Sequence, residues 1–262
     1  MTSSQGEISQ QPVPRRKRKD AGQPRYEDRD YYVLQWIGEQ GVIRYDQLRR
    51  LLGRESPDKD DWNAVLSPSA TNNAIERWEA KRLVNSAHIV PKESSYYWLS
   101  TAGFQFVELD LPHYRPKSSE MPYLLACNQV RLYIEMLNRI DKQEFGDFEH
   151  CTWVSQRELQ TLDPEYKLHI PSGKFTTQTR GQLALEVVTD QEGVEPIMRA
   201  YATSTYSEIW YFALSEHLVL LDQTREQLQR SGVDVSNIYT FNGDSILVPA
   251  ALPKRIRAKK RS

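Results

Sequence analysis

Cysteine and long hydrophobic runs are both scarce in this sequence. It has two cysteines, Cys127 and Cys151, in 262 residues, too few for a disulfide framework or a cysteine-based zinc cluster. No window approaches the roughly 18 apolar residues of a transmembrane helix, and the N-terminus MTSSQGEISQQPVPRRKRKD lacks the apolar stretch of a secretion signal. We therefore expect a cytoplasmic protein without a membrane partner, with its cysteines reduced at core positions.

The sequence also lacks the motifs of several enzyme classes. It contains no phosphate-binding loop, no nucleophile elbow and no Cys/His set with metal-ligand spacing. The aromatic segment 201-YATSTYSEIWYF-212 fits a packed core strand, and we assign it no cofactor. From these patterns we expect neither a cofactor nor a bound metal.

The net charge of −1 hides an asymmetry between the ends and the middle of the chain. Eleven of the 34 basic residues lie in 15-RRKRK-19 and 254-KRIRAKKR-261, so 23 basic and 34 acidic residues remain between Asp20 and Pro253, a net charge near −11. Basic arms suit contact with nucleic-acid phosphates, and they serve equally well as solubilising termini. The acidic middle disfavours a broad DNA groove, so any specific contact must be local.

The order of elements between residues 26 and 111 predicts a winged helix. Apolar residues at helical spacing, closed by glycine, mark the first two helices. The expected elements are helices at 28–41, 46–53, 71–84 and 101–109, and strands at 83–90 and 96–100 around the loop 91–95. Residues 1–25 are expected to be a disordered basic arm.

Strands alternate with helices in the second half, after a proline-bearing linker at 112–122. A helix at 123–140 has a buried stripe, and Ser155 with Glu158 matches a capping box. The remaining expected elements are strands at 148–154, 207–214 and 237–241, a hairpin and third strand within 167–193, and helices near 194–204 and 221–231. This alternation predicts a mixed-sheet α/β domain over 123–249, followed by a basic tail at 250–262.

The second helix of a helix-turn-helix reads bases in the major groove with its N-terminal residues. Here those residues are Thr71, Asn72 and Asn73, with Arg77 one turn later. Asparagine can pair with adenine and arginine with guanine. Alternatively, Thr71 or Asn73 caps the helix, with Asn73 and Glu76 as a capping box. Further candidates for phosphate contact, which surface solvation explains equally well, are Lys92 in the wing and Arg44, Arg49 and Arg50 around the preceding helix.

Two stretches resemble a known family. One is 96-YYWLSTAGFQFVEL-109, close to the Leu-Thr-x-x-Gly turn of winged helices. The other is the series 128-NQVRLYIE-135, 153-WVSQREL-159, 169-HIPSG-173, 183-LALEVV-188 and 208-EIWYF-212. Together they resemble the replication-relaxation family of plasmid and mobile-element proteins. The resemblance implies a winged helix joined to a domain similar to restriction-endonuclease-fold nucleases, over about residues 28–242.

This sequence differs from that family at the positions that would form the nuclease active site. The family hairpin usually reads His-x-Pro-Asp-Gly, whereas 169-HIPSG-173 has Ser172 in place of the aspartate. Glu186 matches the first glutamate of the next strand, but Val188 occupies the second acidic position, which is a lysine in related nucleases. A Mg²⁺-dependent phosphodiesterase needs at least two oxygen ligands. Since strand residues two apart share a face, Glu186 would look into the site without a second carboxylate.

An active nuclease or nickase remains an alternative. It would use Glu186 with Asp163 or Asp190 and Mg²⁺, with His169 as a base and Arg199 in place of the lysine. A lone histidine beside a turn is more often structural. A second alternative is a winged-helix adaptor that binds proteins.

We expect a sequence-specific double-stranded DNA-binding protein of a bacterial plasmid or mobile element, without catalysis. The resemblance implies a role in replication or transfer control, or in transcriptional regulation. The degenerate nuclease-like domain would then support assembly, as a homodimer or with a protein partner of the mobile-element machinery.

Overall fold

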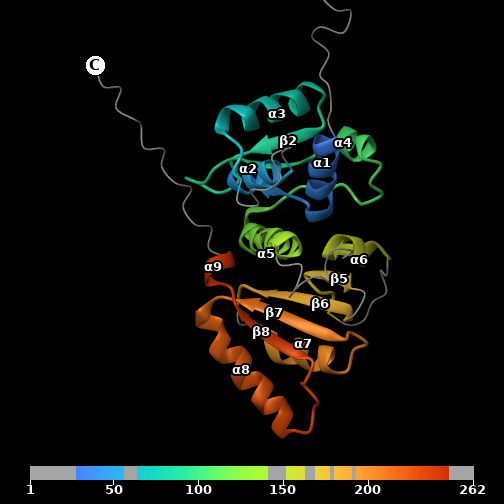
Figure 1. Ribbon diagram of the computed structural model, residues 1–262, viewed down its shortest axis with the longest axis vertical. Helices are drawn as coiled ribbons and strands as arrows, with labels where there is room; N and C mark the ends of the chain where they lie inside the picture. Colours follow the sequence, from blue (N-terminus) through green and yellow to red (C-terminus); the bar gives the residue numbers. More distant parts are fainter. Residues whose placement is uncertain are drawn as a thin grey trace, which may run out of the picture.

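The computed structural model describes residues 28–55, 64–140, 152–162, 169–177, 180–190 and 193–247, with the backbone alone for 137–140. Over these ranges the chain is a mixed α/β protein with one three-stranded and one five-stranded sheet (Figure 1). The expected arms at 1–25 and 250–262, and the candidate Asp163, lie outside the described residues. Within these ranges, no helix combines the length and apolarity needed to cross a membrane.

Residues 28–111, here called the N-terminal unit, build the smaller sheet. Its strands lie in the order β1-β3-β2 and all pair antiparallel. Buried Trp36, Leu48 and Trp78 join the helices over this sheet in one hydrophobic core. The elements are α1 (Asp28–Gln40), β1 (Ile43–Arg44), α2 (Tyr45–Arg54), α3 (Pro68–Ala80), β2 (Val84–Ala87), β3 (Tyr96–Leu99) and α4 (Thr101–Phe106).

The start of α3 corrects one prediction. The helix begins three residues before the expected Thr71, with Ser67 as N-cap and Pro68 at its first turn. The Ser67 hydroxyl accepts a hydrogen bond from the Ala70 amide at 3.2 Å, the usual N-cap arrangement. Neither Thr71 nor Asn73 is therefore the cap, and the expected capping box of Asn73 and Glu76 does not start this helix.

Residues 118–247, here called the C-terminal unit, build the larger sheet in the order β4-β5-β6-β7-β8. Strands β4, β5 and β6 pair antiparallel, and β6, β7 and β8 pair parallel. The elements are the 3-10 turn η1 (Ser118–Glu120), α5 (Met121–Ile140), β4 (Thr152–Ser155), α6 (Gln156–Leu162), β5 (Gly173–Thr177), β6 (Gly181–Val188), α7 (Val194–Ala202), β7 (Glu208–Ala213), α8 (Ser215–Arg230), β8 (Ile238–Asn242) and α9 (Asp244–Leu247).

Helices cover both faces of the larger sheet, with α5 on one side and α7 and α8 on the other (Figure 1). The alternation along β6 sets this division: Leu183, Leu185 and Val187 pack with the α5 core, whereas Ala184 and Val188 pack with α7 and α8. Because strand side chains alternate, Glu186 shares the face of Val188, as expected from the sequence.

Helix α5 joins the two units. Its predicted apolar stripe is confirmed, since Cys127, Val130 and Ile134 are buried against the larger sheet. Its other side carries Asn128, which donates to the Val42 carbonyl at 2.7 Å, and Arg131, which forms an ion pair with Glu39 at 2.7 Å. No pattern in the sequence indicates that this polar side is also buried.

Two boundaries have causes that lie far away in the sequence. Helix α8 begins at Ser215 instead of near 221, because the Asp244 carboxylate accepts a hydrogen bond from the Ser215 amide at 2.9 Å. At the start of β5, a Cβ on Gly173 would collide with the indole of Trp153, so glycine allows the ring to lie against the backbone.

The predicted capping box of Ser155 and Glu158 at the start of α6 is confirmed. The Ser155 amide donates to the Glu158 carboxylate, and the Glu158 amide donates to the Ser155 hydroxyl.

Candidate functional site

A pocket of about 240 Å³ lies where β6 ends and α7 begins. Gly193, at φ 73°, turns the chain into α7 through the left-handed region that glycine adopts without strain. This turn places the first residues of α7 after the end of β6, where Val194 and Ile197 line the pocket together with Tyr123 of α5. The pocket, here called the Glu186 pocket, is lined by Tyr123, Gln156, His169, Glu186, Val187, Val188, Thr189, Asp190, Val194, Ile197 and Tyr211.

The Glu186 carboxylate, 5% exposed, is held by three side chains. His169 Nε2 lies 3.1 Å from Oε1, and the Tyr201 hydroxyl donates to Oε2 at 2.9 Å. The Ser172 hydroxyl donates to Oε1 at 3.4 Å. A carboxylate accepts about four hydrogen bonds, so these donors use most of its capacity and stabilise its charge in a buried position.

Ser172 occupies the position where the resembled family has an aspartate. Its hydroxyl oxygen accepts from the Tyr123 hydroxyl at 2.9 Å and from the Val187 amide at 3.0 Å. The hydroxyl proton is directed to Glu186. A serine here therefore ties α5 and β6 to the Glu186 carboxylate without adding a second negative charge.

Two tyrosines at this site were missed by the sequence analysis, which assigned 201–212 to core packing alone. Burial, followed by the nearby Glu186 charge, raises the pKa of both Tyr201 and Tyr211, so both phenols stay protonated. Tyr201 donates its proton to Glu186, whereas the Tyr211 hydroxyl has no hydrogen-bond partner among the described residues. The usable signal was the choice of tyrosine over phenylalanine, because a buried phenol usually has a polar partner.

Of the residues expected to serve a nuclease, Glu186 and Asp190 line the same pocket, and Asp163 lies outside the described residues. Asp190 is exposed, and Val188 contributes an apolar side chain to the lining. Arg199 lies on the α7 surface in an ion pair with Glu195 at 2.7 Å. Within the part of the chain that the structure describes, no group of three His, Cys, Asp or Glu side chains is placed to hold a metal ion.

His169 gives this site a pH dependence. The hydrogen bond with Glu186 raises the pKa of His169 above its ordinary 6.5, and burial opposes this. A histidine whose pKa is higher in the folded state stabilises that state fully below the unfolded value, and this contribution disappears as pH rises through the folded value. We expect His169→Gln to lower the free energy of unfolding more at pH 5.5 than at pH 8.5, as measured by urea unfolding.

The matched control for this prediction is the same substitution in a Glu186→Gln background. Since the hydrogen bond with Glu186 is the main cause of the raised pKa, the pH-dependent part of the His169→Gln effect should disappear there. An effect of His169→Gln that is equal at both pH values in the otherwise native protein would contradict the assignment.

Two candidate DNA-reading residues form contacts within the N-terminal unit, and the burial of Thr71 corrects its expected role. Thr71 is fully buried, and its hydroxyl donates to the Ser67 carbonyl at 3.0 Å. Arg77 is partly exposed and donates to both carboxylate oxygens of buried Asp30, at 2.9 and 3.0 Å. Thr71 cannot reach a base edge, and Arg77 would have to leave Asp30 to do so.

The other candidates differ in how available they are. Asn73 is exposed on α3, and so is Asn72, whose Oδ1 accepts from the Tyr45 hydroxyl at 2.9 Å. Lys92 is exposed in the turn between β2 and β3, at φ 68°. Arg49 is partly buried and donates to the Leu66 carbonyl at 2.9 Å, and Arg50 is also partly buried.

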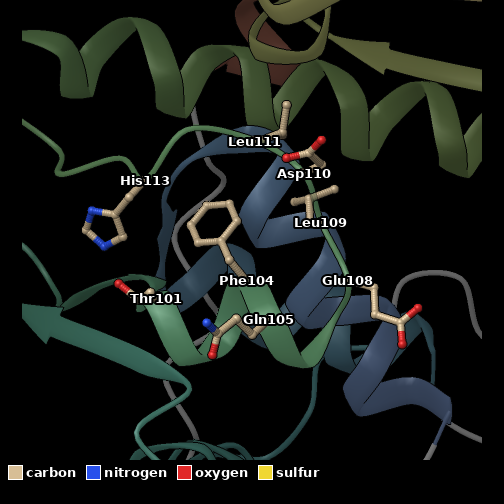
Figure 2. A pocket seen from close by; sticks show the side chains of 8 residues that line it. All are labelled: Thr101, Phe104, Gln105, Glu108, Leu109, Asp110, Leu111 and His113. Atoms are coloured by element: carbon tan, nitrogen blue, oxygen red, sulfur yellow. The ribbon is translucent and has the colours of Figure 1, made fainter.

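A second hollow, about 370 Å³ in volume, lies beside α4 in the N-terminal unit. Figure 2 shows Phe104 near its centre, with Glu108 and His113 on opposite sides. The rings of Phe104 and His113 lie 6.1 Å apart. None of the residues predicted from the sequence to carry function lines this hollow.

Comparison with protein-family models and with curated protein sequences gave no match to this chain. The functional assignment therefore depends on the residues and geometry described above.

Proposed function

We propose that the chain is a sequence-specific double-stranded DNA-binding protein in which residues 28–111 act as a winged helix. The element order of this unit supports the proposal: helix, short strand, two helices, then two antiparallel strands around a turn. In such a domain the third helix enters the major groove. Here that helix is α3, and the turn at 91–95 between β2 and β3 is the wing.

The observation that carries the proposal is the outward-facing first half of α3. Asn72 and Asn73 are exposed there, and α3 lies at the end of the molecule opposite α8 (Figure 1). Asparagine pairs bidentately with adenine in the major groove. Lys92 in the wing is exposed for a phosphate contact.

The second half of α3 restricts where DNA can lie. Glu76 and Glu79 are exposed on it, and a carboxylate near DNA repels the phosphates. Base reading is therefore confined to the first turns of the helix, through Asn72 and Asn73. This set is narrower than the sequence suggested, because Thr71 is buried and Arg77 is paired with Asp30.

We assign the C-terminal unit the role of a scaffold without catalysis. Its strand order, antiparallel through β4, β5 and β6 and then parallel to β7, is compatible with the nuclease-like frame that the resemblance implies. The Glu186 carboxylate is engaged by His169 and Tyr201, and Ser172 and Val188 replace the other site residues. The cellular role that the resemblance implies is control of plasmid replication, transfer or transcription.

The test of this proposal is Asn73→Ala in the full chain. A preferred duplex is first selected from a random pool, and its affinity is compared with that of a scrambled duplex by fluorescence anisotropy. Loss of one bidentate base contact costs about 1–3 kcal/mol of discrimination, so we expect roughly 5- to 150-fold lower preference with nearly unchanged affinity for the scrambled duplex. Lys92→Ala should weaken both duplexes similarly and reduce the salt dependence.

The matched control is Asn85→Ala, since Asn85 is an exposed asparagine on β2 rather than α3. It should leave sequence preference unchanged. Failure to enrich any sequence from the pool would overturn the proposal and favour the protein adaptor. Nicking of supercoiled plasmid in Mg²⁺ or Mn²⁺ that disappears in Glu186→Gln would instead establish the nuclease.

A further inference from the structure

We propose that the Glu186 pocket binds a small organic amine in its protonated form, with the ammonium group against Glu186 and Tyr211. This proposal goes beyond the proposed function, because DNA contact lies at the other unit. It rests on the acceptors, the unpartnered hydroxyl and the apolar wall that meet in the pocket.

The first observation is the charge lining the pocket. Glu186 is buried within it and Asp190 is exposed at its rim, whereas His169 is the one basic side chain among the described lining residues. Three donors reach the Glu186 carboxylate, so about one acceptor position remains on it. The remaining acceptor position on Glu186 therefore suits a ligand that brings an N–H donor and positive charge.

The second observation is the Tyr211 hydroxyl. The side chain is 1% exposed, and its hydroxyl has no hydrogen-bond partner among the described residues. A buried hydroxyl without a partner costs free energy, which a phenylalanine at the same position would avoid. On strand β7, Tyr211 is the register partner of Glu186 on β6, so both side chains lie on the same face of the sheet, and both line the pocket. An ammonium group has three donors and can serve both.

The third observation is the apolar part of the lining. Val188, Val194 and Ile197 contribute aliphatic groups to it, which suit a hydrocarbon body. At about 240 Å³, the pocket exceeds the roughly 150 Å³ cavity that holds benzene in another protein. It therefore has room for a short alkyl or single-ring amine, and its lining has both polar and aliphatic groups for the two ends of such a molecule.

The experiment compares matched probes on the full chain by isothermal titration calorimetry. The charged probes are n-butylammonium and benzylammonium, and the neutral counterparts are n-butanol and benzyl alcohol. We expect the charged member of each pair to bind at least tenfold more tightly, because a hydrogen bond to a charged group is stronger than a neutral one. Glu186→Gln should remove this preference.

Two tyrosine variants separate a ligand role from a structural role. Tyr211→Phe should weaken butylammonium binding about tenfold while its Tm stays equal to or above that of the parent protein, since the lost hydroxyl has no partner in the free protein. Tyr201→Phe removes the donor to Glu186 and should lower Tm. A Tm for Tyr211→Phe that falls as far as that of Tyr201→Phe would overturn the assignment of the hydroxyl to a ligand.

The remaining outcomes each decide the proposal. Equal binding of amines and alcohols would show that the pocket is an apolar cavity without preference for an ammonium group. If neither bound, the pocket would not be a ligand site. Competition by Mg²⁺ for butylammonium would show that the pocket is a metal site instead.

A lysine side chain carries the same ammonium group, so Nα-acetyl-lysinamide is an added probe. If it binds as well as butylammonium, a partner protein can supply the amine; if it does not, the amine is a free small molecule.

Discussion

Arg131→Met is expected to lower the free energy of unfolding by about 3–5 kcal/mol, the usual cost of removing one partner from a buried ion pair. Arg131 contacts Glu39 at 2.7 Å and Glu135 at 2.8 Å, and its side chain is 6% exposed. Methionine preserves packing beside Trp36, over which the guanidinium lies at 4.9 Å. Glu39 would then have no cationic partner among its described contacts, and Glu135 would have Arg54 alone. Urea unfolding at pH 7 measures the loss.

The pH dependence of the stability loss, through protonation of Glu39 and Glu135, provides a check on this prediction. Burial already raises the pKa of Glu39 in the native protein, whereas Arg131 and Arg54 outweigh burial and lower the pKa of Glu135. Removing Arg131 should raise both values, so the folded variant binds protons more tightly and its deficit shrinks as pH falls. Adding Glu39→Gln and Glu135→Gln should recover part of the stability. A loss below about 1 kcal/mol would mean that solvent replaces the guanidinium, contrary to the burial described.

Arg77→Met is expected to lower the free energy of unfolding by about 2–3 kcal/mol, because it removes the guanidinium that donates to both oxygens of the fully buried Asp30 carboxylate. We place the value below the usual range because Arg77 is itself partly exposed and Asp30 keeps a hydrogen bond from Trp78 Nε1 at 3.1 Å. A residue that only read bases would leave stability unchanged. Urea unfolding of the free protein therefore separates the two roles.

Asn73→Ala provides the comparison for Arg77→Met, because Asn73 lies on the same helix and is exposed. We expect it to change the free energy of unfolding by no more than about 0.5 kcal/mol while lowering sequence preference. If Arg77→Met instead left stability intact and lowered sequence preference, Arg77 would belong to the DNA contact and the pair with Asp30 would be incidental.

Local patterns in the sequence predicted much of the secondary structure. Spacing of three and four identified the buried stripe of α5, and alternation along β6 placed Glu186 and Val188 on one face. The start of α3 was wrong although its signal was present, since Ser67 followed by Pro68 is a common helix opening. Thr71 was therefore expected at the surface, whereas it is buried in the structure.

What the sequence could not show depends on partners distant along the chain. Asn128 meets Val42 across 86 positions, and the cap of α8 comes from Asp244, 29 residues later. No local pattern identifies such pairs. At the candidate site, Glu186 was predicted as the remaining carboxylate, but its donor Tyr201 lies on a different element, and a periodicity argument treats tyrosine as a core residue.

The position of α5 makes folding of the two sheets interdependent. One side of this helix completes the core of the larger sheet, and the other supplies Asn128 and Arg131 to the N-terminal unit. Cutting the chain ahead of α5 would leave Val42 and Glu39 without these partners, so we expect the two sheets to unfold as one cooperative unit. A ligand that bound in the Glu186 pocket would then stabilise the N-terminal unit, including α3, as well as the C-terminal unit.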